Sequence, residues 1–331
     1  MYNIAIVGAT GAVGREILST LIKREFPIKS LTLLASERSA GEELTFGNAK
    51  VIVKNINEFE IKNIDFAFFS AGSKVSELWA QKFANAGAVV IDNTSLFRME
   101  KDIPLIVPEI NGKKIRKMKS GIIANPNCST IQMVLSLKKI DELFGLKKIV
   151  VSTYQSVSGT GQKGIEELKN ELKKPIKKED KVYSRDIAYN VIPHIDDFTS
   201  NGFTKEEMKM VNETKKIMGK KNLKINSTCV RVPVLRGHSE TIYVETKKEI
   251  KLNKLLEQWE ETPNLVLSKE QKDYPTPKET EGTFDTYVGR VRKDLNSERA
   301  MSYWVVSDNL LKGAAFNSVQ IAEEIIKYRK K

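Results

Sequence analysis

The chain has 331 residues, of which 40% are hydrophobic and 29% are charged, a composition typical of a folded globular protein with more than one domain. No apolar run reaches the roughly 18 residues of a membrane span, and the start lacks the features of a secretory leader, so we expect a cytoplasmic protein with no membrane partner. The net charge of +12 comes from scattered lysines and arginines without interleaved aromatic residues, which indicates a solvated surface that attracts anionic small molecules and no nucleic-acid partner.

The first half of the chain alternates short apolar runs with helical patterns. The runs are too rich in valine and isoleucine to face water, which is typical of strands in a parallel sheet that helices cover on both faces. We therefore predict a Rossmann-like, doubly wound α/β domain. Its strands are expected within 2–9, 30–36, 49–55, 65–71 and 88–93, and its helices within 11–24 and 75–88.

The second half has longer and less regular elements, which indicate an α+β domain with an antiparallel or mixed sheet. Helices are predicted within 161–174 and 204–219, and two long strands around a turn within 225–247, where Pro233 suggests an edge or a bulge. Residues 170–180 and 272–286 have the composition of loops. The final helical pattern covers residues 310–330.

A glycine motif, Gly8, Gly11 and Gly14, joins the first predicted strand to the first predicted helix. Glycines allow a tight turn and a close approach to a pyrophosphate, which then meets the unpaired N–H groups of the helix. The spacing differs from the usual G-x-G-x-x-G fingerprint, and a simple tight turn is the alternative. The position after the first strand favours a dinucleotide site.

The end of the second predicted strand favours NADP over NAD as the cofactor. An NAD site usually has an acidic residue there for the ribose hydroxyls, whereas Ser36, Arg38 and Ser39 offer a cation and hydroxyls that suit a 2′-phosphate. Glu37 is the counter-argument, because its carboxylate would serve a ribose if it pointed inward.

The two cysteines lie in different contexts. Cys229 belongs to an alternating, strand-like run, so we expect a small buried thiol. Cys128 directly precedes an apolar helical pattern, where the helix dipole lowers a thiol's pKa and favours the nucleophilic thiolate; a buried thiol at a helix start is the alternative. His238, in a glycine-flanked turn, is the candidate base, and His194, in a loop, is its competitor.

Eight stretches in order give the chain a resemblance to the aspartate-semialdehyde dehydrogenase family, and to its Gram-positive-type branch in particular. They are "VGATGAVG", "LASERSAG", "IDNTSLFRM", "PNCSTIQ", "YQSVSGTG", "EEMKMVNETKKI", "CVRVPVLRGHSE" and "DNLLKGAAFNSVQIAE". The resemblance implies reversible, NADPH-dependent reduction of L-4-aspartyl phosphate to L-aspartate 4-semialdehyde with release of phosphate. This step leads to lysine or diaminopimelate, threonine, methionine and isoleucine.

The resemblance also implies roles for individual residues. Cys128 matches the nucleophile that forms a thioester, His238 the acid/base group, and Gln155 the amide that orients the intermediate. Arg231 matches the guanidinium that binds the substrate α-carboxylate, and Glu206 the partner of its α-amino group. The phosphate group would be bound by Arg98, Asn127 and Lys209. The alternative for Glu206 and Lys209 is an exposed ion pair on one helix face.

Cofactor contacts and domain organisation follow from the same resemblance. The expected cofactor contacts beyond Gly8 are Thr10, Gly11, Ala12, Val13, Ser36, Arg38, Ser39, Ser70, Gly72, Asn93, Thr94, Ser158, Gly159 and Asn309. Because the final helix of this family returns to the nucleotide domain, we expect residues 1–127 with 309–331 to bind NADP and residues 128–308 to form the catalytic and dimerisation domain. A homodimer or homotetramer without a metal ion is expected.

Two other functions remain open at this point. N-acetyl-glutamyl-phosphate reductase carries out parallel chemistry, but its thiol context is "PGCYPT"-like, whereas this chain has "PNCST". A non-catalytic NADP-binding sensor or nucleic-acid-binding protein would use the basic surface, but it would have no reason to retain Cys128, Gln155, Arg231 and His238 together.

Overall fold

The structure is a computed structural model that describes residues 1–174, 176–177, 179 and 181–329. The chain divides into two compact units, Met1–Asn127 with Ala314–Lys331 and Cys128–Gly313. From the sequence, we expected the chain to re-enter the first domain at residue 309. In the structure, the chain re-enters the first unit at Ala314.

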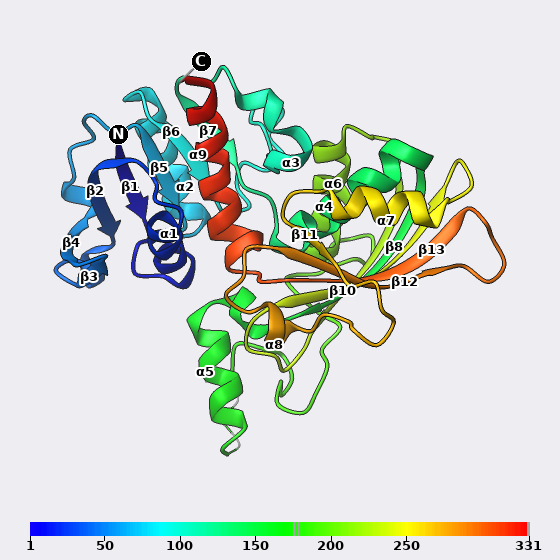
Figure 1. The fold of residues 1–331 in the computed structure, drawn as a ribbon. Helices are drawn as coiled ribbons and strands as arrows, with labels where there is room; N and C mark the ends of the chain where they lie inside the picture. The colour runs from blue at the N-terminus through cyan, green and yellow to red at the C-terminus, as the bar shows by residue number, and fades with distance from the viewer. Residues whose placement is uncertain (175, 178, 180, 330–331) are drawn as a thin grey trace. The chain divides into compact units, whose positions relative to one another are not determined.

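A seven-stranded sheet forms the centre of the first unit, in the order β3-β4-β2-β1-β5-β6-β7 (Figure 1). All neighbouring strands are parallel except β3, which pairs antiparallel with β4. The predicted doubly wound sheet is therefore confirmed, while the short strands β3 and β7 had no prediction. The strands are β1 (Tyr2–Val7), β2 (Ile28–Ala35), β3 (Glu43–Phe46), β4 (Ala49–Asn55), β5 (Phe66–Phe69), β6 (Val89–Asp92) and β7 (Gly121–Ala124).

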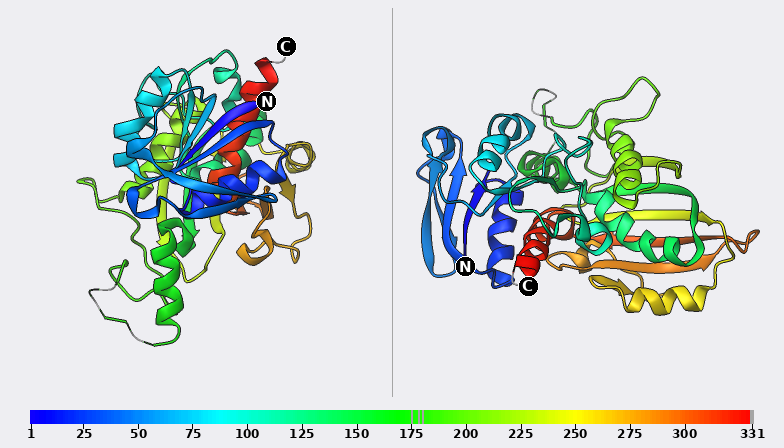
Figure 2. Two further views of the ribbon diagram at one scale, coloured as in Figure 1. Left: turned by 90° about the vertical axis from the view of Figure 1, so that its left-hand side faces the viewer. Right: turned by 90° about the horizontal axis from the view of Figure 1, so that it is seen from above.

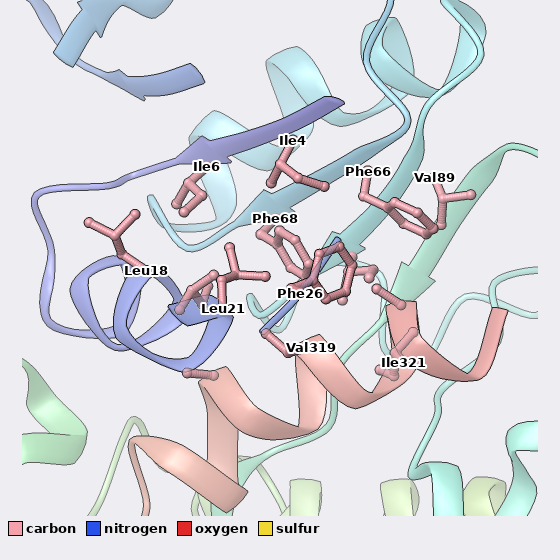
Figure 3. Close-up of a cluster of buried hydrophobic side chains, with 14 of the residues drawn as sticks. Ile4, Ile6, Leu18, Leu21, Phe26, Phe66, Phe68, Val89, Val319 and Ile321 are labelled. Atoms are coloured by element: carbon pink, nitrogen blue, oxygen red, sulfur yellow. The ribbon is translucent and has the colours of Figure 1, made fainter. Parts of the chain in front are cut away.

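Helices cover both faces of this sheet because its strands are apolar on both sides. Along β1, Ile4 and Ile6 pack toward α1 (Ala12–Lys23) and α9 (Phe316–Arg329), as Figure 3 shows. Ala5 and Val7 belong to a second cluster on the opposite face, which α2 (Ser73–Asn85) covers. The view from above in Figure 2 shows α1 and α9 side by side on one face. The short helix α3 (Pro108–Asn111) also contacts α9.

The predicted final helix differs in its first part from the structure. Residues Leu311–Ala315 form a π-helical segment, η6, and the regular α-helix α9 begins at Phe316 rather than at residue 310. In α9, Val319, Ile321 and Ile325 are fully buried in the core of the first unit. The last segment of the chain is thus part of the first unit.

The second unit is built on a six-stranded mixed sheet in the order β11-β12-β13-β10-β8-β9. The pairs β8/β9 and β11/β12 are parallel, and the other neighbours are antiparallel, which confirms the predicted mixed sheet. The two predicted strands around the turn exist, but β8 lies between them, and β9 is an edge strand. The strands are β8 (Leu146–Gln155), β9 (Lys224–Arg231), β10 (His238–Thr246), β11 (Leu265–Leu267), β12 (Thr286–Lys293) and β13 (Ala300–Ser307).

Three helices pack along this sheet: α4 (Cys128–Phe144), α6 (Lys205–Met218) and α7 (Leu252–Glu260). In Figure 1 they lie on the same side of the strands. The second helix, α6, begins with a capping box between Thr204 and Glu207 and ends at Gly219 in the left-handed conformation, so local signals define both of its ends. The central helix, α4, is buried along most of its length.

The remaining elements of the second unit lie in or near the two predicted loops. Helix α5 (Gln162–Glu171) ends inside the predicted loop 170–180, of which residues 175, 178 and 180 lie outside the described residues. The loop 272–286 contains the short helix α8 (Pro277–Thr280) and reaches the start of β12. In the part of the chain that the structure describes, no helix has the length and apolar character needed to cross a membrane.

Candidate active site

Two of the three glycines in the motif of the first unit, Gly8 and Gly14, leave no space for a side chain. Gly8 has a φ of +89°, and a Cβ atom there would lie 2.8 Å from the main-chain nitrogen of Ala71. A Cβ atom on Gly14, inside α1, would lie 2.8 Å from the Cα atom of Ala9. Helix α1 has Gly11 as its N-cap and no capping side chain, so N–H groups of its first turn remain available. This arrangement fits the pyrophosphate of a dinucleotide.

Two cavities lie at the carboxyl ends of the strands of this sheet. The first, of about 380 Å³, includes the predicted residues Gly8, Thr10, Gly11, Ser36, Arg38, Ser39 and Ser70 in its lining. The second, of about 280 Å³, includes Val13, Ser70, Gly72, Asn93 and Thr94. Ser70 lines both cavities. Of the cofactor residues predicted in this unit, all but Ala12, the first residue of α1, therefore line one of the two cavities.

The first cavity also has an apolar part that sequence reasoning missed. Ile56, Val75, Leu78 and Trp79 line it together with Asn57. An aromatic and aliphatic wall next to hydroxyl groups and a guanidinium suits a nucleoside with a nearby phosphate. Glu37, the counter-argument for NADP, is not among the residues that line this cavity.

Polar residues beyond the end of β6 are held rigidly. Asp92 is fully buried and accepts hydrogen bonds from the main-chain N–H and the hydroxyl of Thr94 at 2.8 and 2.9 Å, while burial raises its pKa. Arg98 donates to the carbonyls of Asn125 and Asn93 at 3.0 and 2.8 Å. Main-chain groups thus fix the guanidinium of Arg98 in the first unit, to which Asn127, the residue before Cys128, also belongs.

Cys128 is the first residue of α4, and its half-buried thiol forms no disulfide within the described part of the chain. Gln132 lies one turn further along the same face of the helix. Its side-chain amide donates a hydrogen bond of 3.3 Å to the main-chain carbonyl of His238, the first residue of β10. The face of α4 that carries Cys128 is therefore joined to the start of the strand that carries His238.

His238 is completely buried, and its two ring nitrogens have different surroundings. Nδ1 accepts a hydrogen bond of 3.1 Å from the main-chain N–H of Ser156. Nε2 has no hydrogen-bond partner among the described residues. Burial, assisted by the positive charge of Arg231, lowers the pKa of His238 to about 3. The ring is therefore neutral at physiological pH.

Arg231, at the end of β9, lies beside the same wall of the site. Its Nη1 donates to the carbonyl of Ser156 at 2.7 Å, while its Nε is buried without a partner among the described residues. A Cβ atom on the exposed Gly159 would lie 3.0 Å from Arg231 Nη1 and 3.2 Å from His238 Nε2. Among the described residues, Arg231 Nε and His238 Nε2 therefore both lack a hydrogen-bond partner, and both side chains lie next to Gly159.

A buried polar chain extends from Gln155 to α6. Nε2 of Gln155 donates to Glu206 at 3.0 Å, and Lys209 forms ion pairs of 3.0 Å with Glu206 and 2.8 Å with Asp196. Although burial opposes its charged form, Lys209 has a raised pKa because these two carboxylates stabilise the ammonium group. Glu206 is 5% exposed, so the alternative of an exposed surface ion pair is wrong.

Asn309 belongs to a hydrogen-bond network that includes Ser156, which contacts His238. Its Oδ1 accepts from the hydroxyls of Ser156 and Ser158 at 3.1 and 3.2 Å and from the N–H of Gly237 at 2.9 Å. Sequence reasoning assigned Ser158 and Asn309 to the cofactor, but it did not single out Ser156. The main chain of Ser156 contacts both His238 and Arg231. Gln132 was also missed, although its position one turn after Cys128 was a usable signal.

The second cysteine lies on β9, and the second histidine lies in the segment before α6. Cys229 is fully buried, as predicted, and burial raises the pKa of its thiol to about 12, which makes it a poor nucleophile. The ring of His194 stacks on Phe198 with 4.4 Å between ring centroids.

Comparison with known proteins agrees with this geometry. A model described as "Semialdehyde dehydrogenase, NAD binding domain" matches residues 3–118, and one described as "Semialdehyde dehydrogenase, dimerisation domain" matches residues 137–312. The aspartate-semialdehyde dehydrogenase of Aquifex aeolicus is 51% identical to this chain over 335 residues, which cover 98% of each protein. The Bacillus subtilis enzyme is 46% identical and covers 98% of this chain and 97% of its own length.

The chain belongs to the aspartate-semialdehyde dehydrogenase family.

Solved structures of aspartate-semialdehyde dehydrogenases share the fold. The structure of aspartate semialdehyde dehydrogenase II from Vibrio cholerae complexed with ASA has a TM-score of 0.94 and 46% identity, and the match covers 99% of this chain and 98% of that one. The enzyme with NADP from Candida albicans has a TM-score of 0.78 and 25% identity over 100% and 99% of the two chains. Both predicted domain types, the Rossmann-like nucleotide domain and the dimerisation domain, are those of this oxidoreductase family.

Proposed function

We propose that the protein catalyses the reversible, NADPH-dependent reduction of L-4-aspartyl phosphate to L-aspartate 4-semialdehyde with release of phosphate, on the route to lysine or diaminopimelate, threonine, methionine and isoleucine. One observation supports this function most directly. The helix that Cys128 opens is hydrogen-bonded through Gln132 to the strand that His238 opens, and Nε2 of His238, which has no hydrogen-bond partner in the described part of the chain, lies beside Arg231. A thiol, a hydrogen-bonding ring and a carboxylate-binding cation are the groups that this reaction needs.

Cys128 is the proposed nucleophile. Its thiolate attacks the carbonyl carbon of the acyl phosphate, the bond from that carbon to the phosphate oxygen breaks, and a thioester forms. NADPH, when bound, would supply a hydride for reduction of the thioester carbon, and the C–S bond to Cys128 would then break to free the aldehyde. The thioester separates phosphate loss from reduction, so the second step begins from an acyl group already fixed to α4.

Arg231 and Glu206 are the proposed ligands of the substrate's amino-acid part. The guanidinium of Arg231 is buried and held by the Ser156 carbonyl, and its unpaired Nε is a donor for the α-carboxylate. Glu206, which Gln155 orients, would accept the α-ammonium group. We assign the phosphate group to Lys209 together with Arg98 and Asn127, and we assign orientation of the intermediate to Gln155.

NADP is the proposed cofactor of the first unit, Met1–Asn127 with Ala314–Lys331. Support comes from the lining of its larger cavity, where Arg38 lies with the hydroxyls of Ser36 and Ser39. Ser158, Gly159 and Asn309, in the second unit, are the proposed contacts near the nicotinamide. Because a catalytic thiol has to stay reduced, we also propose that the enzyme works in the cytoplasm.

A homodimer formed through the second unit is the proposed minimum assembly, with a tetramer as the alternative. The sheet of this unit carries the half-exposed side chains Val150 and Tyr154 on one face of β8, and Tyr154 packs against Trp304 with 5.5 Å between ring centroids. Apolar groups of this kind are typical of a subunit interface. Analytical ultracentrifugation of the intact protein distinguishes dimer, tetramer and monomer, and a monomer would contradict this assembly.

The decisive test is reduction of NADP⁺ by L-aspartate 4-semialdehyde, followed at 340 nm with and without phosphate. We expect turnover that requires phosphate and that is slower with NAD⁺. The semialdehyde of N-acetylglutamate is the matched alternative substrate. Turnover of that compound alone would reassign the substrate, and no turnover from a folded, NADP-binding protein would contradict the proposed enzyme activity.

A further inference from the structure

Tyr183 contacts Arg231, the proposed ligand of the substrate α-carboxylate, from the segment that follows α5. Its side chain is half-buried. The Cζ atom of Arg231 lies over the face of the Tyr183 ring, 5.9 Å from the ring centroid. This distance is within the roughly 6 Å over which the face of an aromatic ring attracts a cation. The ring therefore covers part of the guanidinium group.

The hydroxyl of Tyr183 fixes one end of the ring. It donates a hydrogen bond of 2.9 Å to Oγ1 of Thr160, the last residue of the short helix η4 (Val157–Thr160). A glycine leaves space for this hydroxyl, because a Cβ atom on Gly164 would lie 2.6 Å from the Tyr183 oxygen. A larger residue at position 164 would displace Tyr183 from Thr160.

The main chain at Tyr183 is fixed to α5 by two carboxylates. Glu167 is 3% exposed and accepts hydrogen bonds from the main-chain N–H groups of Val182 and, at 3.3 Å, of Tyr183. About one turn later on α5, Glu171 accepts from the N–H groups of residues 187 and 188 at 2.7 and 2.9 Å. Hydrogen bonds to a charged acceptor are stronger than those between neutral groups. The segment that carries Tyr183 is therefore held along the helix.

Apolar packing completes the surroundings of the ring. Tyr183 packs against a small buried cluster that includes Val157, Leu168 and Ile187. Burial raises the pKa of Tyr183, so its hydroxyl stays protonated at physiological pH and is able to donate to Thr160. A neutral tyrosine ring has a negative face, and that face is turned toward the guanidinium of Arg231.

The contact with Tyr183 limits how the Arg231 side chain moves. Nη1 of Arg231 donates to the carbonyl of Ser156 at 2.7 Å, and Nε is buried without a partner among the described residues. An arginine side chain loses much rotamer freedom when it binds a ligand. A guanidinium that a carbonyl and a ring already hold loses less of this freedom, so it binds a carboxylate more tightly.

We propose that Tyr183 is a positioning residue for substrate binding, whose ring holds the guanidinium of Arg231 in the orientation that binds the substrate α-carboxylate. This inference rests on the proposed function and extends the carboxylate site to the segment after α5. Tyr183 acts through Arg231 and takes no part in the chemical step. It therefore affects the KM for the substrate more than kcat.

Steady-state kinetics with L-aspartate 4-semialdehyde test this role. Tyr183→Leu should raise KM about three- to tenfold and leave kcat within about twofold, because a cation–π contact is lost while the reacting groups are unchanged. Tyr183→Phe retains the ring and should have a KM within about twofold of wild type. Tyr189→Leu changes an 88% exposed tyrosine of the same segment and is the matched control, with both constants unchanged. A wild-type KM in Tyr183→Leu, or equal losses in the Leu and Phe variants, would overturn the proposal.

A double-mutant cycle tests whether Tyr183 acts through Arg231. In Arg231→Leu protein the ring has no guanidinium to hold, so the further change Tyr183→Leu should alter kcat/KM by less than about twofold. An equal loss from Tyr183→Leu in the wild-type and Arg231→Leu backgrounds would show that the two residues act independently, which contradicts the proposed role.

Nuclear magnetic resonance tests the contact without any substrate. In protein with ¹³C-labelled tyrosine rings, Tyr183→Phe identifies the Tyr183 signal among those of the nine tyrosines. This signal should shift in Arg231→Leu, because the charge over the ring is removed. An unchanged signal would show that the contact does not form in solution. Since this measurement needs no turnover, failure of the proposed reaction in wild-type protein is distinguishable from failure of the contact.

Discussion

Gly313 lies against Cys128: a Cβ atom on Gly313 would be 2.7 Å from the Cys128 Cβ atom and 3.2 Å from its Cα atom. Such distances are too short for carbon atoms, and the nearest neighbours include the main chain at the start of α4, which cannot rotate away. The end of the second unit therefore controls the space beside the thiol.

The substitution Gly313→Ala should displace Cys128 and lower kcat by about 10²-fold, because small shifts of a reacting atom have large effects on rate. NADP binding and the melting temperature, measured in parallel, separate this effect from unfolding. A variant with wild-type kcat would show that the first turn of α4 adjusts freely.

The Cys128→Ala variant should lose at least about 10³-fold in turnover and still bind NADP, because the cofactor cavities belong to the first unit. Cys229→Ala is the matched control, since this second thiol is buried and has a pKa of about 12. The control should retain near wild-type turnover. Similar losses in both variants would contradict the assignment of the nucleophile.

Arg231→Leu should raise the KM for aspartate semialdehyde by about ten- to a hundredfold, since a charge-assisted hydrogen bond to the carboxylate is lost. Arg231→Lys retains the charge but not the planar geometry, and we expect an intermediate KM. Steady-state kinetics with saturating phosphate and NADP⁺ measure both. An unchanged KM in Arg231→Leu would exclude the carboxylate role.

Arg38→Ala should weaken NADP binding by about tenfold and leave NAD binding unchanged, because the guanidinium pairs only with a 2′-phosphate. Glu37→Ala, at the neighbouring position, is the control and should not reduce the affinity for either nucleotide. Isothermal titration with both nucleotides gives the comparison. A loss of NAD affinity in Arg38→Ala would point to a general effect on the loop.

His238 should make the protein less stable in acid. Its pKa is lowered to about 3 from the ordinary 6.5, so below about pH 6.5 the unfolded chain binds the proton first and the free energy of unfolding falls until about pH 3. From pH 7 to 4.5 this residue accounts for a loss of about 2–3 kcal/mol. Urea unfolding of wild type and His238→Gln at both values isolates this contribution. Equal pH dependence in the two proteins would contradict a buried neutral ring.

Local signals explain why much of the fold was predictable and why the proposed cofactor residues of the first unit could be chosen from the sequence. The glycine motif, the apolar strands and the capping box of α6 are each read within a few residues, and Gly8, Arg38 and Thr94 all line the predicted kind of cavity. The strand β3 was not predicted because its four residues, although they alternate between polar and apolar, are too few for this pattern to stand out.

The polar contacts of the second unit depend on long-range pairing and were harder to infer. Ser156 meets His238 only because β8 and β10 are neighbours in the sheet, although 82 positions separate the two residues in the chain. The π-helical segment before α9 was likewise not predicted, since its residues show the same apolar pattern as a regular helix.

The place of α9 in the first unit has a consequence for how the protein is made. Val319, Ile321 and Ile325 complete the core that β1 begins, yet the ribosome adds them after every residue of the second unit. During synthesis the second unit, Cys128–Gly313, is available in full before the first one. The nucleotide-binding unit can therefore close its core only after the whole of the second unit has been synthesised, and a chain truncated before α9 would carry an intact thiol-bearing unit and an open sheet in the first unit.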